Sequence, residues 1–129
     1  MRPTPLLSIV YTAAAISLLF SAMFDVHTVS GSSMSPAFED MQTVFVFRWA
    51  YGLQPPIFNR YIIRWAHVQV GDVLVIREPE SGARVVKRCA ETDGSSVYVL
   101  GDNREVSRDS RHYGFVDARQ IEGRVLLPP

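Results

Sequence analysis

The sequence predicts a mainly β protein, a small antiparallel β-barrel-like domain preceded by one N-terminal transmembrane helix. Two observations lead to this fold class. No charged residue occurs between Pro3 and Phe24. The rest of the 129-residue chain consists of short runs rich in β-branched and aromatic residues, separated by turn-forming residues. Short strands with such separators are typical of small antiparallel sheets and barrels.

The apolar run from Pro3 to Phe24 is long enough, as a helix, to cross a hydrocarbon core of about 30 Å. Arg2 precedes the run and Asp25 follows it, which favours a cytoplasmic N-terminus and an exported remainder. We therefore expect residues 1–25 to be the anchor of a single-pass protein of the cell membrane. Residues 26–129 are expected to form an extracytoplasmic β-rich domain.

Two other interpretations of the apolar run are weaker. A cleavable signal peptide needs small residues at the last and third-last positions before the cut. Cuts after Ala22 or Ser21 would place Phe20 or Leu19 at the third-last position. A buried core helix would require a larger domain around it than the remaining residues can build.

The domain is expected to contain six strands. One segment departs from their pattern of short strands separated by turn residues. That segment, residues 48–67, carries both tryptophans and the pair Pro55-Pro56. It is predicted to be a membrane-proximal insertion, a hairpin or short helix on the lipid surface, with packing of its aromatic residues in the core as the alternative. The predicted strands are Thr43–Phe47, Val68–Val70, Val73–Ile76, Arg84–Arg88, Val97–Leu100 and Arg124–Leu127.

The composition argues against several classes of function. Thirteen Lys and Arg residues balance thirteen Asp and Glu residues, so the broad basic surface typical of nucleic-acid binding is not expected. One cysteine and three scattered histidines make a zinc site unexpected, and we expect no metal and no cofactor. Cys89 follows Lys87 by two residues in an apolar run and is expected to be a packing residue.

The candidate chemistry begins with the serines of Gly31–Pro36, just beyond the apolar run. A serine needs a base, and Lys87 is the only lysine in the chain. Strand alternation places Lys87 on the apolar face with Val85 and Cys89, where burial would lower its pKa and favour the neutral amine. The alternation by itself favours the other interpretation, an edge-strand lysine whose ammonium lies in water.

A third polar stretch runs from Gly101 to Arg111. Its density of hydrogen-bonding side chains is, taken alone, typical of a surface loop. Asp109 and Arg111 lie close enough in sequence to form a pair that braces this loop. Ser107 or Ser110 would then point a hydroxyl inward.

Taken together and in order, these stretches resemble the motif boxes of the type I signal peptidases, also called leader peptidases. The matching segments are Ser-Met-x-Pro after the apolar run, Val70-Gly71-Asp72-Val73, a strand that contains Val-Lys-Arg, and Gly-Asp-Asn-Arg-x-x-Ser-x-Asp-Ser-Arg-x-x-Gly. The resemblance extends from about Val29 to Val116, and the chain looks like a minimal form of the family.

The resemblance implies a role for each matched residue. Ser33 would be the nucleophile and Lys87 the general base, with Ser107 orienting the lysine amine. The backbone N–H of Ser33 would stabilise the oxyanion, with the neighbouring Ser32 as the candidate for a further donor. Met34 and Pro36 would contact substrate, and the structural support would come from Gly101, Asp102, Asn103, Asp109 and Arg111.

The implied function is a membrane-bound serine endopeptidase that removes signal peptides from exported preproteins after small residues of the Ala-x-Ala type. Its partners would be preprotein signal peptides and membrane lipid, with no nucleic acid. Gly31 stands where some family members have a serine that supplies the second oxyanion donor, so Ser32 or Ser35 would have to replace it or the donor is missing.

Three alternatives stay open at this point. One is a Ser/Lys peptidase dedicated to a single substrate, since the Gly-x-Pro-Gly-Asp segment that usually follows the lysine box is absent. Another is an inactive relative that binds preproteins. The third is a Ser-His-Asp triad that uses His112 or His67, although neither histidine lies in a motif.

Overall fold

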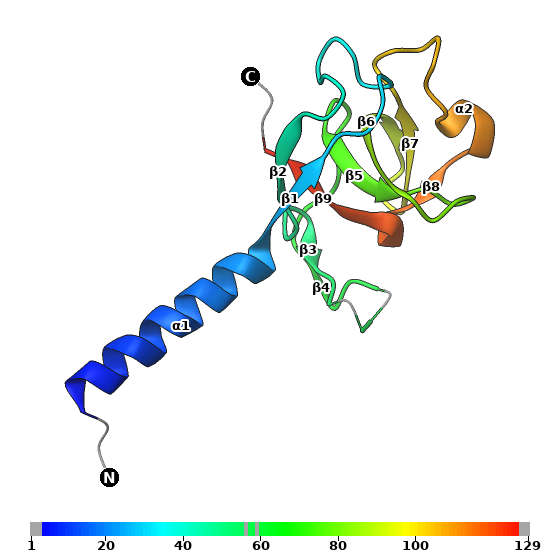
Figure 1. Cartoon of the computed structure of the whole chain (residues 1–129). Helices are drawn as coiled ribbons and strands as arrows, with labels where there is room; N and C mark the ends of the chain where they lie inside the picture. The colour runs from blue at the N-terminus through cyan, green and yellow to red at the C-terminus, as the bar shows by residue number, and fades with distance from the viewer. Residues whose placement is uncertain (1–3, 56, 59, 127–129) are drawn as a thin grey trace.

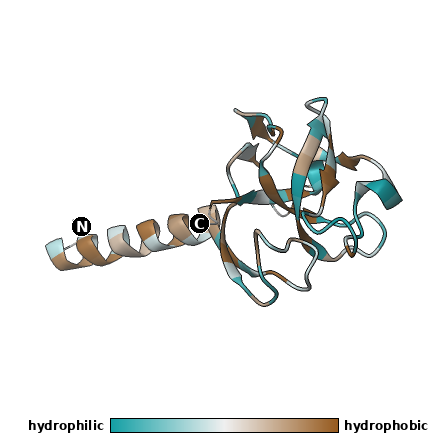
Figure 2. Ribbon diagram, turned by 90° about the horizontal axis from the view of Figure 1, so that it is seen from above, coloured by the Kyte–Doolittle hydropathy of each residue, from teal (hydrophilic) through white to brown (hydrophobic). Residues whose placement is uncertain are grey.

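The computed structural model describes residues 4–55, 57–58 and 60–126. A long helix, α1 (Pro5–Met23), extends away from a curled antiparallel sheet domain, as Figure 1 shows. None of the residues of α1 is buried, and seen from above the helix is mostly apolar or neutral (Figure 2). Within the described residues, α1 is the one helix that is long and apolar enough to cross a membrane. Pro3, the predicted start of the run, lies outside the described residues.

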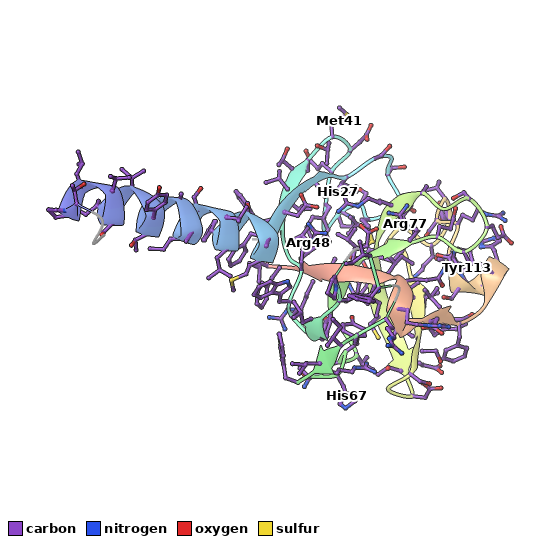
Figure 3. The ribbon with its side chains drawn as sticks, turned by 90° about the horizontal axis from the view of Figure 1, so that it is seen from below. His27, Met41, Arg48, His67, Arg77 and Tyr113 are labelled. Carbon is purple, nitrogen blue, oxygen red and sulfur yellow. The ribbon has the colours of Figure 1, made fainter. Side chains whose placement is uncertain are left out.

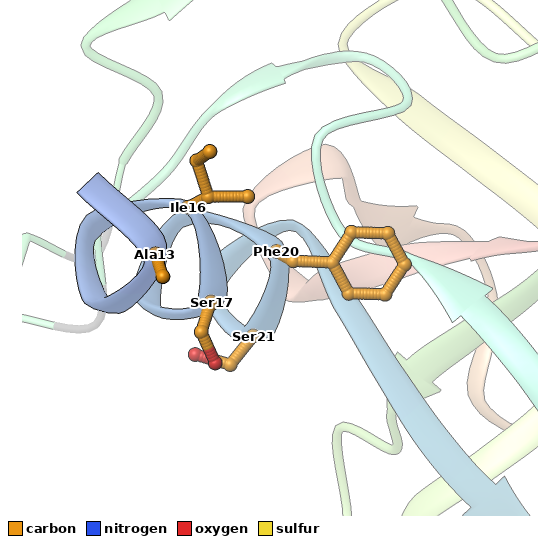
Figure 4. A pocket seen from close by; sticks show the side chains of 5 residues that line it. All are labelled: Ala13, Ile16, Ser17, Phe20 and Ser21. Atoms are coloured by element: carbon orange, nitrogen blue, oxygen red, sulfur yellow. The ribbon is translucent and has the colours of Figure 1, made fainter. Parts of the chain in front are cut away.

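One face of α1 carries a shallow hollow, shown in Figure 4. Ala13, Ser17 and Ser21 follow one another at four-residue intervals, so they share this face of the helix. Ile16 and Phe20 line the hollow as well. The small side chains leave room that larger residues would fill.

Among the described residues, seven strands form one sheet in the order β1-β2-β9-β5-β6-β7-β8, and every neighbouring pair is antiparallel. The strands are β1 (Phe24–Thr28), β2 (Thr43–Phe47), β5 (Val73–Arg77), β6 (Arg84–Thr92), β7 (Ser96–Leu100), β8 (Val116–Asp117) and β9 (Ile121–Val125). A short helix α2 (Ser110–Tyr113) and a 3-10 turn (Ala118–Gln120) lie between later strands. The predicted fold class, mainly β with one N-terminal apolar helix, is confirmed.

The apolar side chains gather on both faces of β5. Leu74 and Ile76 belong to one buried cluster, which also contains Cys89 and Val99. Val73 and Val75 point to a second cluster, which contains Val29, Met34, Phe38 and Val46 among others. β5 is thus covered on both faces. Its neighbour β6 pairs with β5 on one side and with β7 on the other, so β6 lies in the interior of the sheet and not at an edge.

The segment 48–67 contains a two-stranded hairpin of β3 (Gly52–Leu53) and β4 (Ile63–Arg64). In Figure 1 this hairpin extends from the same lower side of the domain as α1. Its aromatic residues divide between two environments: Tyr51 is buried in the core, whereas Trp65 is 54% exposed.

One predicted strand is wrong, because Val68–Val70 has no strand partner. Asp72 explains the difference, since its carboxylate accepts hydrogen bonds from the Gln69 backbone N–H and the Tyr51 hydroxyl. These bonds hold a turn from Gln69 to Asp72, and Gly71 within this turn has a φ of 96° that favours glycine. Val68 is nevertheless buried in the core.

Candidate active site

Ser33 and Lys87 are neighbours in space although 54 positions separate them in the chain. Ser33 lies in the turn region that follows β1, and Lys87 lies in the middle of β6. The Lys87 Nζ is 3.1 Å from the Ser33 Oγ, which is hydrogen-bonding distance. This separation is short enough for direct proton transfer between the hydroxyl and the amine.

Lys87 is 3% exposed. It lies opposite Leu74 of β5 and on the face that Cys89 also occupies, as the alternation of β6 predicts. The alternative of a solvated edge-strand lysine is therefore wrong, because β6 has a strand on each side. The Cys89 thiol is buried too, and burial together with the charge of Asp72 raises its pKa to about 11, so it lacks the thiolate that reactivity requires.

Burial lowers the pKa of Lys87 below its ordinary value. The carboxylates of Asp109 and Glu78 act in the opposite direction, and the charge of Arg111 adds to the lowering. Desolvation is the largest of these effects, because an ammonium loses more hydration on burial than a neutral amine does. A larger fraction of the amine is thus neutral at a given pH, as a general base requires.

Ser107 is the second hydrogen-bond partner of Lys87. Its Oγ is 3.2 Å from the Lys87 Nζ, and the residue is 4% exposed. The lysine amine therefore lies between two serine hydroxyls, of which the Ser33 residue is partly exposed and Ser107 is enclosed. Such an arrangement orients the amine toward the more accessible serine.

Asp109 is fully buried behind this group. Its carboxylate accepts hydrogen bonds from the Gly101 N–H at 3.0 Å and from the Arg111 Nε at 2.9 Å. Burial alone would raise the pKa of Asp109, but hydrogen bonds from Arg111, the Gly101 backbone and Ser107 hold it well below its ordinary range. The resulting anion joins the Gly101 turn, Ser107 and Arg111 in one structure.

Gly101 occupies a position where a side chain cannot fit. A Cβ there would overlap the Ser107 side chain and the carbonyl oxygen of Ser33. The same carbonyl accepts a hydrogen bond of 2.8 Å from the Asn103 N–H. The loop that begins at Gly101 thus contacts the backbone of one serine and the side chain of the other.

Asp102 extends this contact to the lysine strand. Its carboxylate pairs with Arg88 through two hydrogen bonds, 2.9 Å from Nε and 2.7 Å from Nη2. A bidentate pair of this kind has a defined geometry as well as charge attraction. Since Arg88 directly follows Lys87, the pair connects the loop to the strand that carries the lysine.

The candidate oxyanion donors differ in availability. Within the described part of the chain, no hydrogen bond uses the Ser33 N–H as a donor. The Gly31 N–H, by contrast, donates to the Asp40 carboxylate at 2.7 Å. Ser32 is exposed beside these groups. The Ser33 N–H is therefore free to bind an oxyanion, whereas the Gly31 N–H is already engaged.

Two residues expected to contact substrate lie in different environments. Pro36 is exposed. Met34 is fully buried in the second apolar cluster, so it supports the serine turn from inside and offers no surface to a ligand. Its expected contact with substrate does not agree with this position.

The histidines lie elsewhere. The Nδ1 of His112 accepts a hydrogen bond from the Asp109 N–H at 3.3 Å, and the side chain that pairs with Ser33 is Lys87. His67 lies at the outer edge of the molecule (Figure 3). Among the described residues, His, Cys, Asp and Glu form no cluster of three or more that could hold a metal ion.

Sequence reasoning missed Glu78. This residue is 8% exposed at the end of β5, and its charge acts on Lys87. A single carboxylate after an apolar strand carries no motif signal, so only the spatial proximity of the two residues identifies it.

Comparison with known proteins also indicates a peptidase. The family model for signal peptidases, peptidase S26, matches residues 4–97 and 92–128. The chain therefore belongs to the signal peptidase S26 family.

Three relatives illustrate the similarity. Signal peptidase I of Buchnera aphidicola subsp. Schizaphis graminum (strain Sg) is 25% identical over 82 residues, 64% of this chain and 26% of that protein. Signal peptidase I of Bacillus caldolyticus is 62% identical over 29 residues, 22% of this chain and 16% of that protein. Signal peptidase IB of Staphylococcus aureus (strain Mu50 / ATCC 700699) is 67% identical over 27 residues, 21% of this chain and 14% of that protein. The chain thus spans about a quarter or less of the length of these relatives.

Proposed function

We propose that this chain is a membrane-anchored serine endopeptidase that cleaves signal peptides from exported preproteins, with Ser33 as nucleophile and Lys87 as general base. The observation that carries the proposal is the 3.1 Å separation of the Ser33 Oγ from the amine of a buried lysine. Membership of the signal peptidase S26 family supports the same function.

The proposed reaction has two stages. In the first, neutral Lys87 takes the hydroxyl proton of Ser33 as Oγ attacks the scissile carbonyl carbon, and the Ser33 N–H donates to the oxyanion. The lysine then gives this proton to the departing amine, so that the C–N bond breaks and a seryl ester forms. In the second stage, Lys87 takes a proton from water as the water oxygen attacks the ester carbonyl carbon. Lys87 then returns this proton to Ser33 Oγ as the ester C–O bond breaks, which releases the new carboxyl terminus and restores the hydroxyl and the neutral amine.

Ser107 and Asp109 have positioning roles in this scheme. Ser107 holds the amine of Lys87 near Ser33, and the Asp109–Arg111 pair supports the loop behind it. No third acid is required, because a buried amine with a lowered pKa accepts the serine proton without one.

The proposed placement in the cell follows from α1. Residues 1–25 would form a single-pass anchor with a cytoplasmic N-terminus, and residues 26–129 the extracytoplasmic domain. The substrates would be preproteins with small residues before the cut, of the Ala-x-Ala type, since shallow pockets select small side chains. A dedicated substrate is the second candidate, favoured by the β3–β4 hairpin within residues 48–67.

The test is cleavage of a model preprotein with an Ala-x-Ala site by the full chain in detergent. We expect wild type to cleave it, and Ser33→Ala and Lys87→Met to lose activity by at least about a thousandfold, as expected for removal of a nucleophile or its base. Ser30→Ala, a change at an exposed serine nearby, is the matched control and should retain the wild-type rate.

The possible failures have different meanings. Full activity of Lys87→Met would exclude the lysine as the base. Absence of cleavage of several Ala-x-Ala preproteins by wild type, with cleavage of one specific exported protein, would favour the dedicated-substrate function. No cleavage of any preprotein despite binding would identify an inactive relative.

A further inference from the structure

A cleft of 750 Å³ lies where α1 meets the sheet domain, away from Ser33 and Lys87. Its lining includes Ala22 from the last turn of α1, Asp25 from β1 and Leu53 from β3. Figure 3 shows Arg48, another lining residue, at the junction between the helix and the domain. The cleft therefore lies at the point where the apolar helix ends.

Four charged groups in the cleft neutralise one another. The Arg84 Nη2 is 2.7 Å from the Asp25 Oδ2, and the Arg77 Nη2 is 2.6 Å from the Glu122 Oε1. Arg84 also pairs with Glu122. Two arginines and two carboxylates thus form a network without excess charge.

Arg48 adds a positive charge that this network does not match. Within the described residues it forms no ion pair, whereas Arg119, also in the lining, pairs with Asp117 at 2.9 Å. The backbone N–H of Arg48 donates to the carbonyl of Met23 at 2.8 Å, which holds the residue beside the end of α1. The cleft consequently has one unmatched cation at the level of the helix terminus.

The side chain of Gln54 adds a hydrogen-bond acceptor that has no donor. Its Nε2 donates to the Arg119 carbonyl at 2.7 Å, but its Oε1 is buried and has no donor among the described residues. A buried acceptor without a partner is costly, so a ligand that donates to it gains affinity. Trp49 and Phe58 line the same cleft, and such aromatic residues are typical of the membrane interface.

We propose that this cleft binds the headgroup of an anionic phospholipid that carries one phosphodiester charge and a hydroxyl donor, such as phosphatidylglycerol. Arg48 contacts the phosphate, and the Gln54 Oε1 accepts from a headgroup hydroxyl. One unmatched arginine corresponds to the single negative charge of a phosphodiester. The inference rests on the part of the proposed function that places α1 in the bilayer.

The experiment titrates the full chain, in a neutral detergent, with a brominated short-chain phosphatidylglycerol and follows quenching of tryptophan fluorescence. Trp65→Phe leaves Trp49, in the cleft, as the remaining tryptophan. We expect saturable quenching, and Arg48→Gln in this background should weaken binding about tenfold, the loss of one charge-assisted hydrogen bond. Arg60→Gln removes an exposed arginine outside the cleft lining and should change the affinity less than twofold.

Three outcomes would overturn the proposal. Equal weakening by Arg48→Gln and Arg60→Gln would mean general charge attraction. Equal affinity for a short-chain phosphatidylcholine, which lacks the net charge and the hydroxyl, would exclude the proposed contacts. Equal affinity for sn-glycerol 3-phosphate would assign the cleft to a soluble phosphate compound and not to lipid.

Cleavage activity is measured separately on the same variants in detergent without added lipid. Arg48 lies outside the proposed catalytic group, so Arg48→Gln should retain the wild-type kcat there. Cleavage without phosphatidylglycerol binding would refute this inference alone. Binding without cleavage by wild type would refute the proposed peptidase and leave the lipid site standing.

Discussion

Replacement of Ser107 by alanine tests whether the enclosed serine positions the lysine. The change removes the partner at 3.2 Å and, within the part of the chain that the structure describes, leaves the Lys87 amine with Ser33 as its remaining hydrogen-bond partner. One such bond contributes about 1 kcal/mol net, roughly a fivefold effect, and the freedom gained by the amine adds to the loss. We expect kcat to fall by about 10- to 100-fold while KM is unchanged, because Ser107 is 4% exposed and does not reach substrate.

The assay is steady-state cleavage of the model preprotein, with thermal unfolding of each variant measured in parallel. Ser110→Ala is the matched control, since Ser110 is a similarly buried serine three residues further along, 2% exposed at the start of α2, whose hydroxyl accepts a hydrogen bond from the Val99 N–H. It should lower the Tm yet retain kcat in the folded protein. A Ser107→Ala enzyme with wild-type kcat, or a Ser110→Ala enzyme with the same loss of kcat, would refute a specific positioning role.

Two further predictions concern the charge of Lys87. Glu78→Gln removes a carboxylate that raises the pKa of Lys87 against the larger effect of burial. The acidic limb of the pH–rate profile, where activity rises as the amine loses its proton, should therefore move to lower pH. Glu80→Gln, a charge change at an exposed residue paired with Arg108, should leave this limb unchanged. Lys87→Met should raise the Tm by several °C, at about 4–8 °C per kcal/mol, because methionine requires no hydration. The pKa of Lys87 in the folded protein is lowered from 10.5, so between these two values the unfolded chain binds more protons than the folded one. The free energy of unfolding of wild type therefore increases as the pH rises over this range. The stability advantage of Lys87→Met should shrink over the same range. An advantage independent of pH, or a limb that moves equally in both glutamate variants, would contradict this account.

Much of the sheet was predictable because its strands alternate and end at turn residues. Thr43–Phe47 agrees with β2 at both ends, and Val73–Ile76 agrees with β5 to within one residue. The sequence indicates a short extended run over residues 26–30, which overlaps the end of β1, but it does not indicate a strand that begins at Phe24, because the apolar run continues through this residue. Its strand conformation depends on pairing with β2, a contact that periodicity cannot reveal.

The candidate site, like the sheet, could be predicted from the sequence only in part. The order of the motifs indicated Ser33, Lys87 and Ser107, and the structure brings these three side chains together. Alternation favoured a solvated lysine, because a sequence does not state which strands flank a given strand. Met34 is another example: a motif position next to the serine does not tell whether a side chain points to the substrate or into the core.

The direct passage of α1 into β1 has a consequence for the choice of bond in the proposed cleavage reaction. The helix ends at Met23 and the five-residue strand begins at Phe24, with no linker between them. A strand of this length spans roughly 17 Å, at about 3.3 Å per residue. With α1 in the bilayer, as we propose, this short segment would set the height of Ser33 above the lipid, so the peptidase would measure the distance of a peptide bond from the membrane as well as read the residues beside it.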